Sequence, residues 1–256
     1  MYRERAAVGI RGAVRWESVS RGGAPARVLP DGCLDLLWSS RAGLLVAGPD
    51  RTAHLSTGTA GERWVGLRLP PGVGPAVFGV PAHELRDLRV ALVELWGRAA
   101  ADLADRVDAA RAAAEAAPTG VPPGFARPAT GLAAASGAVA AVLEGVAVAR
   151  LRAAGGPDPL GTRVAARLAA GGTVAATAAE VGLGARALHR RSQLLFGYGP
   201  KTLARILRMR RALDLAGTGI PLAEVAARTG YADQAHLTRD VTDLAGLPPT
   251  RLLTPG

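Results

Sequence analysis

The sequence is poor in cysteine, histidine and aromatic residues, and each shortage excludes something. Its 256 residues include one cysteine, Cys33, so an intramolecular disulfide is impossible and a cysteine-based zinc site is not expected. His54 and His83 lie far apart without a third ligand nearby, and we expect no metal site. Aromatic residues make up 4% of the chain and hydrophobic residues 49%. This composition favours helices that pack closely through alanine over a large aromatic core.

Long uncharged apolar segments are also lacking. The longest candidate, "GLAAASGAVAAVLEGVAVARL" at residues 131–151, is interrupted by Gly137, Glu144 and Gly145. The first residues, "MYRERAAVGIRG", lack the apolar stretch of a signal peptide. We therefore expect a cytoplasmic protein with no membrane segment.

Positive charge is abundant. The formal net charge is +10 and the isoelectric point is about 11.2, and Lys201 is the one lysine among 31 basic residues. A strongly basic protein usually binds a polyanion, and the arginine guanidinium suits phosphate and guanine. Nucleic acid is the expected partner, with an ordinary solvated surface as the alternative.

The N-terminal part has the pattern of a small β-rich domain. Short apolar or alternating runs are separated by glycine and proline clusters between residues 14 and 80; they are "VRWESV", "CLDLLWS", "GLLVAG" and "RWVGLRL". From residue 80 to residue 97, "VPAHELRDLRVALVELWG", the pattern predicts a helix docked on this domain. Residues 98–117 predict a strong helix with Leu103, Val107 and Ala110 on its apolar side.

Two breaks divide the remainder. Residues 118–131 form a proline- and glycine-rich break, and a second alanine-rich helix follows to about Ala154. The stretch "GGPDP" then marks a domain boundary. The prediction is an α+β chain of three parts: a β-rich effector or dimerisation domain at 1–97, a helical linker region at 98–156 and an all-α domain at 157–256. Residues 1–156 hold 18 basic and 14 acidic residues, a net of +4, and residues 157–256 hold 13 and 7, a net of +6.

The last hundred residues contain an internal repeat. "TVAATAAEVGLGARALHRRSQLLFGYGPKTL" resembles "PLAEVAARTGYADQAHLTRDVTDLAGLPPTRL". Gly182 matches Gly230 at an offset of 48 and Leu188 matches Leu237 at 49, so the second copy has one extra residue after the turn. Each copy has a short helix, a glycine where a positive φ is needed, and a second helix, which is a helix-turn-helix pattern. The basic helix expected at 200–213 joins the two copies.

The polar flank of each second helix is the candidate DNA-reading surface. Arginine pairs with guanine and glutamine with adenine through two hydrogen bonds, and histidine and threonine reach base edges or phosphates. The residues expected to bind DNA are Arg186, His189 and Arg190 in the first copy, and Gln234, Ala235, His236, Thr238 and Arg239 in the second. We expect no catalytic residues and no cofactor.

These two copies resemble the DNA-binding domain of the AraC/XylS family of bacterial transcription regulators, most specifically in "GYADQAHLTRD". The N-terminal region resembles a poorly characterised domain on some actinobacterial regulators of this type. The resemblance implies two helix-turn-helix units that enter successive major grooves of double-stranded DNA. It also implies a small-molecule effector or a homodimer, and RNA polymerase as a partner if the protein is an activator.

The chain departs from the family pattern at four positions. Gly184 and Ala232 stand where serine commonly caps the reading helix, so we expect a capping hydrogen bond to be lost in each unit. Ser192 and Val241 replace a usual phenylalanine, and we expect looser helix packing there.

Other functions stay open. Cys33 in "PDGCLDL" could be a thiol sensor or the alkyl acceptor of a DNA-repair protein, although neighbouring carboxylates should raise its pKa. The basic helices could also belong to an adaptor that binds acidic proteins. The four tryptophans, Trp16, Trp38, Trp64 and Trp96, could line an apolar effector pocket or form the core of the N-terminal domain.

Overall fold

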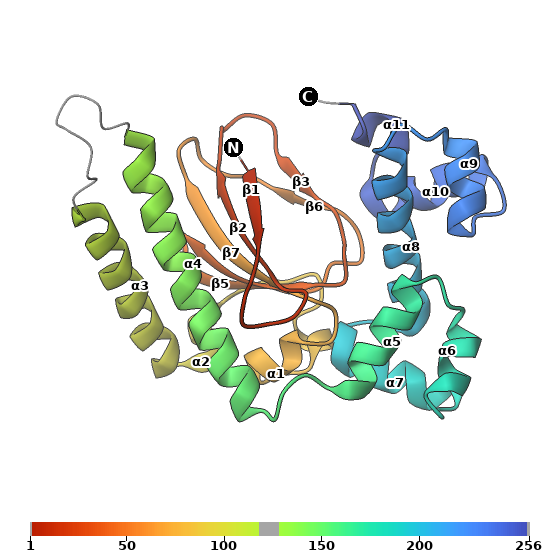
Figure 1. Ribbon diagram of the computed structural model, residues 1–256, viewed down its shortest axis with the longest axis horizontal. Coiled ribbons are helices and arrows are strands. Elements are labelled where there is room, and N and C mark those ends of the chain that lie inside the picture. The colour runs from red at the N-terminus through yellow and green to blue at the C-terminus, as the bar shows by residue number, and fades with distance from the viewer. Residues whose placement is uncertain (1, 118–127, 255–256) are drawn as a thin grey trace.

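Strands dominate the first part of the chain and helices the rest (Figure 1). The computed structural model describes residues 2–117 and 128–254, without the side chains of residues 128–132. The strands are β1 Tyr2–Ala6, β2 Val14–Val19, β3 Ala26–Val28, β4 Leu34–Ser39, β5 Gly43–Ala47, β6 His54–Ser56, β7 Arg63–Leu69 and β8 Arg89–Ala91. The four predicted strands are confirmed as β2, β4, β5 and β7, and the α+β class is confirmed.

The helices follow mainly after residue 91. They are α1 Gly74–Phe78, the 3₁₀ helix η1 Ala82–Glu84, α2 Leu92–Trp96, α3 Arg98–Ala116, α4 Pro128–Ala153, α5 Pro159–Ala169, α6 Val174–Glu180, α7 Ala185–Phe196, α8 Pro200–Ala216, α9 Leu222–Thr229, α10 Gln234–Ala245 and α11 Pro249–Leu252.

Six strands form one antiparallel sheet in the order β1-β2-β7-β4-β5-β8, and β3 pairs with β6 in a separate ribbon. In the centre of the large sheet, β4 and β7 pair in a register that places Leu36 opposite Leu67. Both of these side chains are fully buried. The sheet therefore has a strongly apolar face that needs a covering layer.

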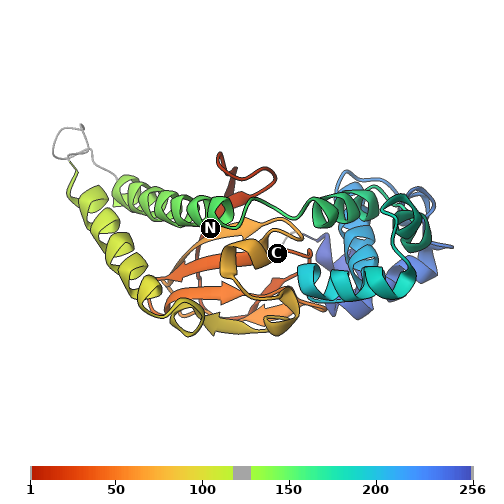
Figure 2. The same ribbon diagram turned by 90° about the horizontal axis from the view of Figure 1, so that it is seen from below.

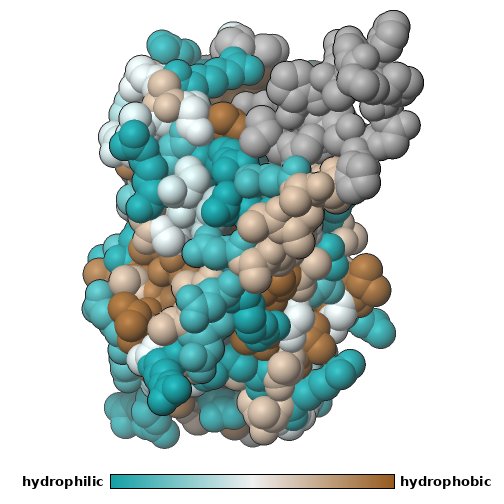
Figure 3. Space-filling model, turned by 90° about the vertical axis from the view of Figure 1, so that its left-hand side faces the viewer, coloured by the Kyte–Doolittle hydropathy of each residue, from teal (hydrophilic) through white to brown (hydrophobic). Residues whose placement is uncertain are grey.

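Helices α3 and α4 provide that layer (Figures 1 and 2). Residues on alternate positions of β4 and β7 share an apolar core with Leu103 and Val107 of α3 and with Leu143 and Ala147 of α4. Glu144 of α4 accepts hydrogen bonds from the backbone of Val8 and Gly9 in the loop after β1. These helices are part of the N-terminal core, and the division proposed at residue 97 stays a prediction. The outer side of this layer mixes hydrophilic and apolar residues (Figure 3).

Part of α4, Ala133–Ala153, is long and apolar enough to cross a membrane by length and composition alone. Leu143 of this segment is fully buried, and Ala147 is too. A core helix of a globular protein passes the same test, and the packing of α4 against the sheet accounts for its apolar character.

The helix predicted at residues 80–97 is wrong. This segment contains η1, the strand β8 and the short helix α2. Asp87 has a φ of 60°, which ends any helix, and Val90 pairs with Val46 at the edge of the sheet. Pairing with β5 overrides the local helical pattern.

The break predicted at residues 118–131 needs a second correction. Residues 118–127 lie outside the described residues, but α4 already begins at Pro128, because proline fits the first turn of a helix. The break is therefore shorter at its C-terminal end than the composition indicated.

Helices α5 to α10 enclose a second apolar core. Buried residues of α8 recur at helical spacing, at Leu203, Ile206, Met209 and Ala212, so this helix runs through the middle of the core. Leu29, from the loop between β3 and β4, packs against the same core. The β-rich region thus contacts the C-terminal helices directly.

Candidate DNA-binding site

Two helix-turn-helix units lie at the two ends of α8. Helices α6 and α7 form the first and helices α9 and α10 the second (Figure 1). The turns contain Gly182 with a φ of 69° and Gly230 with a φ of 79°, a region that glycine occupies cheaply. Helix α7 begins at Ala185 and α10 at Gln234, so the second unit has the one extra residue that the repeat predicted.

The second helices of the two units, α7 and α10, differ in how they begin. Gly184 is the N-cap of α7 and has no side chain to cap it, as predicted. The expected loss at Ala232 is wrong, because the extra residue makes Asp233 the N-cap of α10. Its Oδ1 accepts a hydrogen bond of 2.7 Å from the backbone N–H of His236. The second reading helix therefore keeps a capping bond of the preferred type.

In the first unit, Arg186, His189 and Arg190 are all exposed on α7. Together with Ala185 they line an open hollow of about 320 Å³, which places them on one surface. Leu188 is fully buried on the opposite side of the helix. The His189 ring also lies against the backbone of Gly199 before α8, since a Cβ added at Gly199 would lie 2.6 Å from the ring.

In the second unit, Gln234, Ala235 and Arg239 are exposed, and His236 and Thr238 are half-buried. The His236 ring stands edge-on to the Tyr231 ring at 5.2 Å, and its Nδ1 accepts a hydrogen bond of 3.3 Å from the N–H of Ala232. A neutral imidazole that accepts at Nδ1 carries its proton on Nε2. His236 therefore has a structural contact as well as a donor for a ligand.

A buried carboxylate fastens α10 to α8. Asp240 accepts hydrogen bonds from Arg205 at 2.7 Å and from Arg208 at 2.9 Å. Burial disfavours its ionised form, but these two arginines outweigh that effect and lower the pKa of Asp240 below its usual value. Asp240, Arg205 and Arg208 are not among the residues predicted from the sequence. An acid three residues after Leu237, within the apolar stripe of the helix, was the signal that could have indicated them.

Arg208 also packs over the ring of Tyr231, with its guanidinium carbon 4.1 Å from the ring centroid. Burial and the neighbouring carboxylate of Asp240, opposed by Arg208, together raise the pKa of Tyr231 to about 12. Tyr231, Arg208 and Asp240 thus link the turn of the second unit to the connecting helix.

The two substituted phenylalanine positions are both in the core. Val241 and Ser192 are buried. Among the described residues, the Ser192 hydroxyl has no hydrogen-bond partner. An unpaired buried hydroxyl costs about 1–3 kcal/mol, so the first unit carries a local penalty at Ser192.

The other candidate residues lie in the β-rich region. Burial raises the pKa of the Cys33 thiol well above its usual value, and Asp31 and Asp35 add to the effect. Trp96 is buried in the core, whereas Trp38 also borders an open hollow of about 370 Å³ with Arg63 and Arg111. Among the residues described, no three potential ligands gather to hold a metal ion.

Comparison with known families gives two matches. Residues 177–254 match a family described as a helix-turn-helix domain (HTH_18), and residues 13–91 match a domain of unknown function, DUF6597. No curated protein matches the chain.

Solved structures similar to this chain include a probable AraC family transcriptional regulator from Rhodopseudomonas palustris CGA009. It shares 23% identity over 38% of this chain and 95% of its own, with a TM-score of 0.34. ToxT from Vibrio cholerae O395 shares 9% identity over 93% of this chain and 96% of its own, with a TM-score of 0.48. Unsaturated fatty acid bound wild-type ToxT from Vibrio cholerae strain SCE256 shares 9% identity over 94% of each chain, with a TM-score of 0.46.

The two units on one connecting helix, with the family match over them, define a DNA-binding protein of the tandem helix-turn-helix class. Its class of function is transcription regulation. The chain carries a helix-turn-helix domain of the HTH_18 family at residues 177–254 and a DUF6597 domain at residues 13–91.

Proposed function

We propose that this regulator reads an asymmetric DNA site with α7 and α10, each placed in one of two successive major grooves on the same side of the duplex. The observation that carries the proposal is the presence of an exposed polar flank on each reading helix, at opposite ends of α8. Helix-turn-helix units read grooves one DNA turn apart, about 10 base pairs centre to centre. One chain therefore recognises two half-sites without a dimer.

The two helices have different tasks in this proposal. In α7, Arg186 and Arg190 pair with guanine or phosphate, and His189 contacts the backbone or a base edge. In α10, Gln234 pairs with adenine and Arg239 with guanine. Ala235 contacts a thymine methyl group, while His236 and Thr238 donate to base edges or phosphates.

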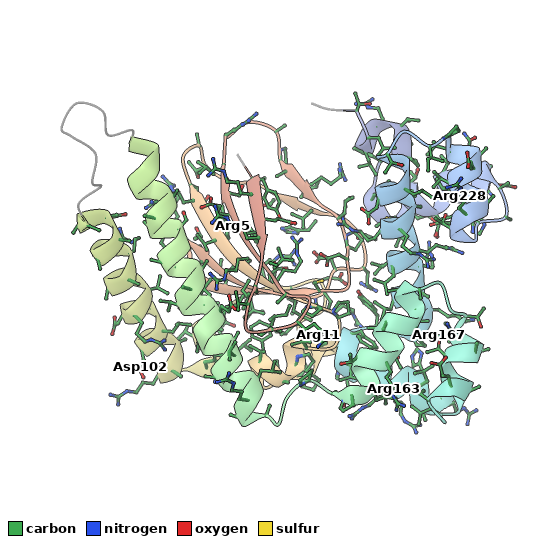
Figure 4. All side chains as sticks on the ribbon, viewed as in Figure 1. Arg5, Arg11, Asp102, Arg163, Arg167 and Arg228 are labelled. Carbon is green, nitrogen blue, oxygen red and sulfur yellow. The ribbon has the colours of Figure 1, made fainter. Side chains whose placement is uncertain are left out.

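Further arginines near the units are candidates for phosphate contacts. Arg163 and Arg167 of α5 and Arg228 of α9 are exposed on the C-terminal helices (Figure 4). Arg167 forms an ion pair with Glu180 at 2.8 Å, and Arg228 pairs with Glu224 of its own helix. Phosphate contacts of this kind set the register of the protein on DNA and carry no sequence information.

The N-terminal region is the proposed control element, through a small effector or through dimerisation. The protein is proposed to act in the cytoplasm, with RNA polymerase as a partner if it activates transcription, and to have no enzymatic activity. The high pKa of Cys33 argues against a thiol sensor or an alkyl acceptor, because the thiolate is the reactive form.

In vitro selection from random duplex DNA with the full-length protein tests the proposal. Gln234→Ala and Arg239→Ala should each weaken binding to the selected site by about 1–3 kcal/mol and change non-specific binding less. Arg98→Ala, on the exposed start of α3, is the control and should bind as the wild type does.

Salt dependence separates the regulator from an adaptor for acidic proteins. The affinity for DNA should fall steeply between 50 and 200 mM salt, by about 10³-fold or more if six phosphates are contacted. Failure to select any sequence, or an unchanged footprint in both α10 variants, would contradict the assigned reading surface.

A further inference from the structure

The β-rich region contacts the C-terminal ends of both reading helices. At the end of α7, the Arg86 guanidinium donates a hydrogen bond of 3.0 Å to the carbonyl of Gly197, the C-cap residue. Gly197 also lies tightly against Pro49, since a Cβ built on it would lie 2.6 Å from Pro49 Cγ. The β-rich region therefore holds the C-terminal end of α7 in place.

The end of α10 is held in a similar way by different residues. Arg27 donates a hydrogen bond of 2.9 Å to the carbonyl of Ala245, and the backbone N–H of Ala53 donates one of 2.7 Å to the carbonyl of Leu244. Both acceptors belong to the last turn of the helix, where carbonyls lack partners within the helix. Arginines at this end also interact favourably with the helix dipole.

A third contact lies between these two. A Cβ built on Gly32, in the loop before β4, would lie 2.9 Å from Leu203 of α8, and Leu29 packs on the C-terminal core. The β-rich region thus spans α7, the connecting helix and α10. Figure 1 shows it along one side of all three, with α6 and α9 on the far side.

These contacts leave the reading surfaces free. The residues proposed to bind DNA lie in the N-terminal halves of α7 and α10, whereas the contacts lie at the last turns. Arg186, Arg190 and Arg239 are exposed with the β-rich region in place. The contacts therefore restrict the position of the helices without covering what they read.

A single connecting helix fixes the relative position of two units poorly, because a small bend moves the far ends. One base pair shifts a half-site by about 3.4 Å and rotates it by about 35°. The β-rich region is a second connection between the two units, independent of α8. It restricts their relative motion before DNA binds, which raises selectivity for one spacing of the half-sites.

We propose that Arg27 and Arg86 are positioning residues for DNA recognition, through which the β-rich region sets the spacing of the two half-sites that the protein accepts. This inference rests on the proposed two-groove reading. The side chains that read bases set sequence, and these two arginines set distance.

Binding to a spacing series tests the inference. The site selected by the wild-type protein is altered by adding or removing one or two base pairs between its halves, and affinity is measured by fluorescence anisotropy with the full chain. The wild type should lose about tenfold or more for each unit change of spacing. The double variant Arg27→Ala/Arg86→Ala should lose most of this preference, while single-base substitutions within each half-site keep their effect.

Three controls make the result specific. Thermal unfolding of each variant verifies that the chain is folded. Arg27→Lys and Arg86→Lys retain a cationic donor and should restore part of the spacing preference, and Arg98→Ala should retain all of it. If folding is lost in the double variant, the single variants supply the measurement.

Three outcomes overturn the inference. An unchanged spacing preference in the folded double variant shows that α8 alone sets the geometry. A gain in affinity at every spacing shows that the contacts oppose binding. Loss of base preference along with spacing preference shows that the arginines act on the reading helices themselves. If the wild type selects no DNA, the proposed function fails before this inference is reached.

Discussion

In several helices of this protein, a single arginine side chain donates a hydrogen bond to a carbonyl at the C-terminal end. Arg150 donates to the carbonyl of Val77 at the end of α1, Arg211 to that of Ala169 at the end of α5, and Arg208 to that of Gly230 after α9. With the contacts at the ends of α7 and α10, five helices are ended in this way. Part of the positive charge that indicates nucleic acid in the sequence therefore serves folding.

Two arginine substitutions should separate these tasks. Arg211→Gln removes a helix-end contact and should lower the free energy of unfolding by about 1–2 kcal/mol, with no change in the salt dependence of DNA binding. Arg190→Gln should leave stability within about 0.5 kcal/mol and reduce the slope of log affinity against log salt by about 1 if the side chain contacts phosphate. Urea unfolding and salt titrations measure both. The same slope change in both variants would contradict the separation.

The acid at position 35 gives a pH-dependent prediction. Burial, opposed by Arg68, raises the pKa of Asp35 to about 6 in the folded protein. Its unfolded value is about 3.9, so the folded state holds this proton more tightly, and the associated stability is lost as pH rises from about 4 to about 6.

Asp35→Asn removes this titration and retains an oxygen that can accept the Trp16 N–H, which lies 2.7 Å from Oδ1. The stability of the wild type relative to Asp35→Asn should fall by about 2–3 kcal/mol between about pH 4 and pH 7. Urea unfolding across this range measures the difference. A difference that does not vary with pH would show that Asp35 titrates normally.

At the scale of elements, the two reading helices form a natural comparison. Helix α10 is capped by the side chain of Asp233, whereas the N-cap residue of α7 is Gly184, which has no side chain to cap the helix. Gly184 has φ −70° and ψ 158°, and an added Cβ would have no heavy atom within 4 Å. A serine fits this position.

Gly184→Ser should therefore stabilise the first unit by about 0.3–1 kcal/mol, and Asp233→Ala should destabilise the second by about 1 kcal/mol. Thermal unfolding measures both, and hydrogen exchange locates each effect in its own helix. Destabilisation by Gly184→Ser would show that the turn tolerates no side chain.

The ion pairs of Asp240 in α10 with the arginines of α8 should contribute more to stability than the helix caps do. Asp240→Asn leaves two arginines beside a neutral partner, and since both arginines are partly exposed we expect a loss of about 1–3 kcal/mol. DNA binding should weaken through displacement of α10. Asp243→Asn, on the exposed side of the same helix, is the matched control and should lose less than about 0.5 kcal/mol.

Local sequence patterns predicted helices and strands correctly where contacts with distant parts of the chain did not override them. The strands with alternating apolar residues and the repeated helices follow directly from the spacing of side chains. Strand β1 is exposed along its whole length and shows no apolar alternation, so only its pairing with β2 reveals it. The prediction of a helix at residues 80–97 was wrong for the opposite reason. The apolar residues there have a helical spacing, but pairing of Val90 with β5 overrides it.

At the scale of the whole molecule, the sequence could indicate two units on one helix but not how they are held. The repeat places glycines and buried leucines in matching positions, which is enough to predict the two units. The contacts of Arg27 and Arg86 join segments far apart in the chain, and no local pattern carries that information. The candidate reading residues, by contrast, are local to their helices and could be proposed without a structure.

The two units at the ends of α8 differ, so the protein has a direction along α8. The side chains of α7 and α10 differ, so under the proposed two-groove binding a duplex that suits both helices suits them in one direction only. When the protein is bound in that direction, the β-rich region has a fixed upstream or downstream orientation relative to the neighbouring gene. Inverting the recognised sequence would turn the whole protein to face the other way along the chromosome.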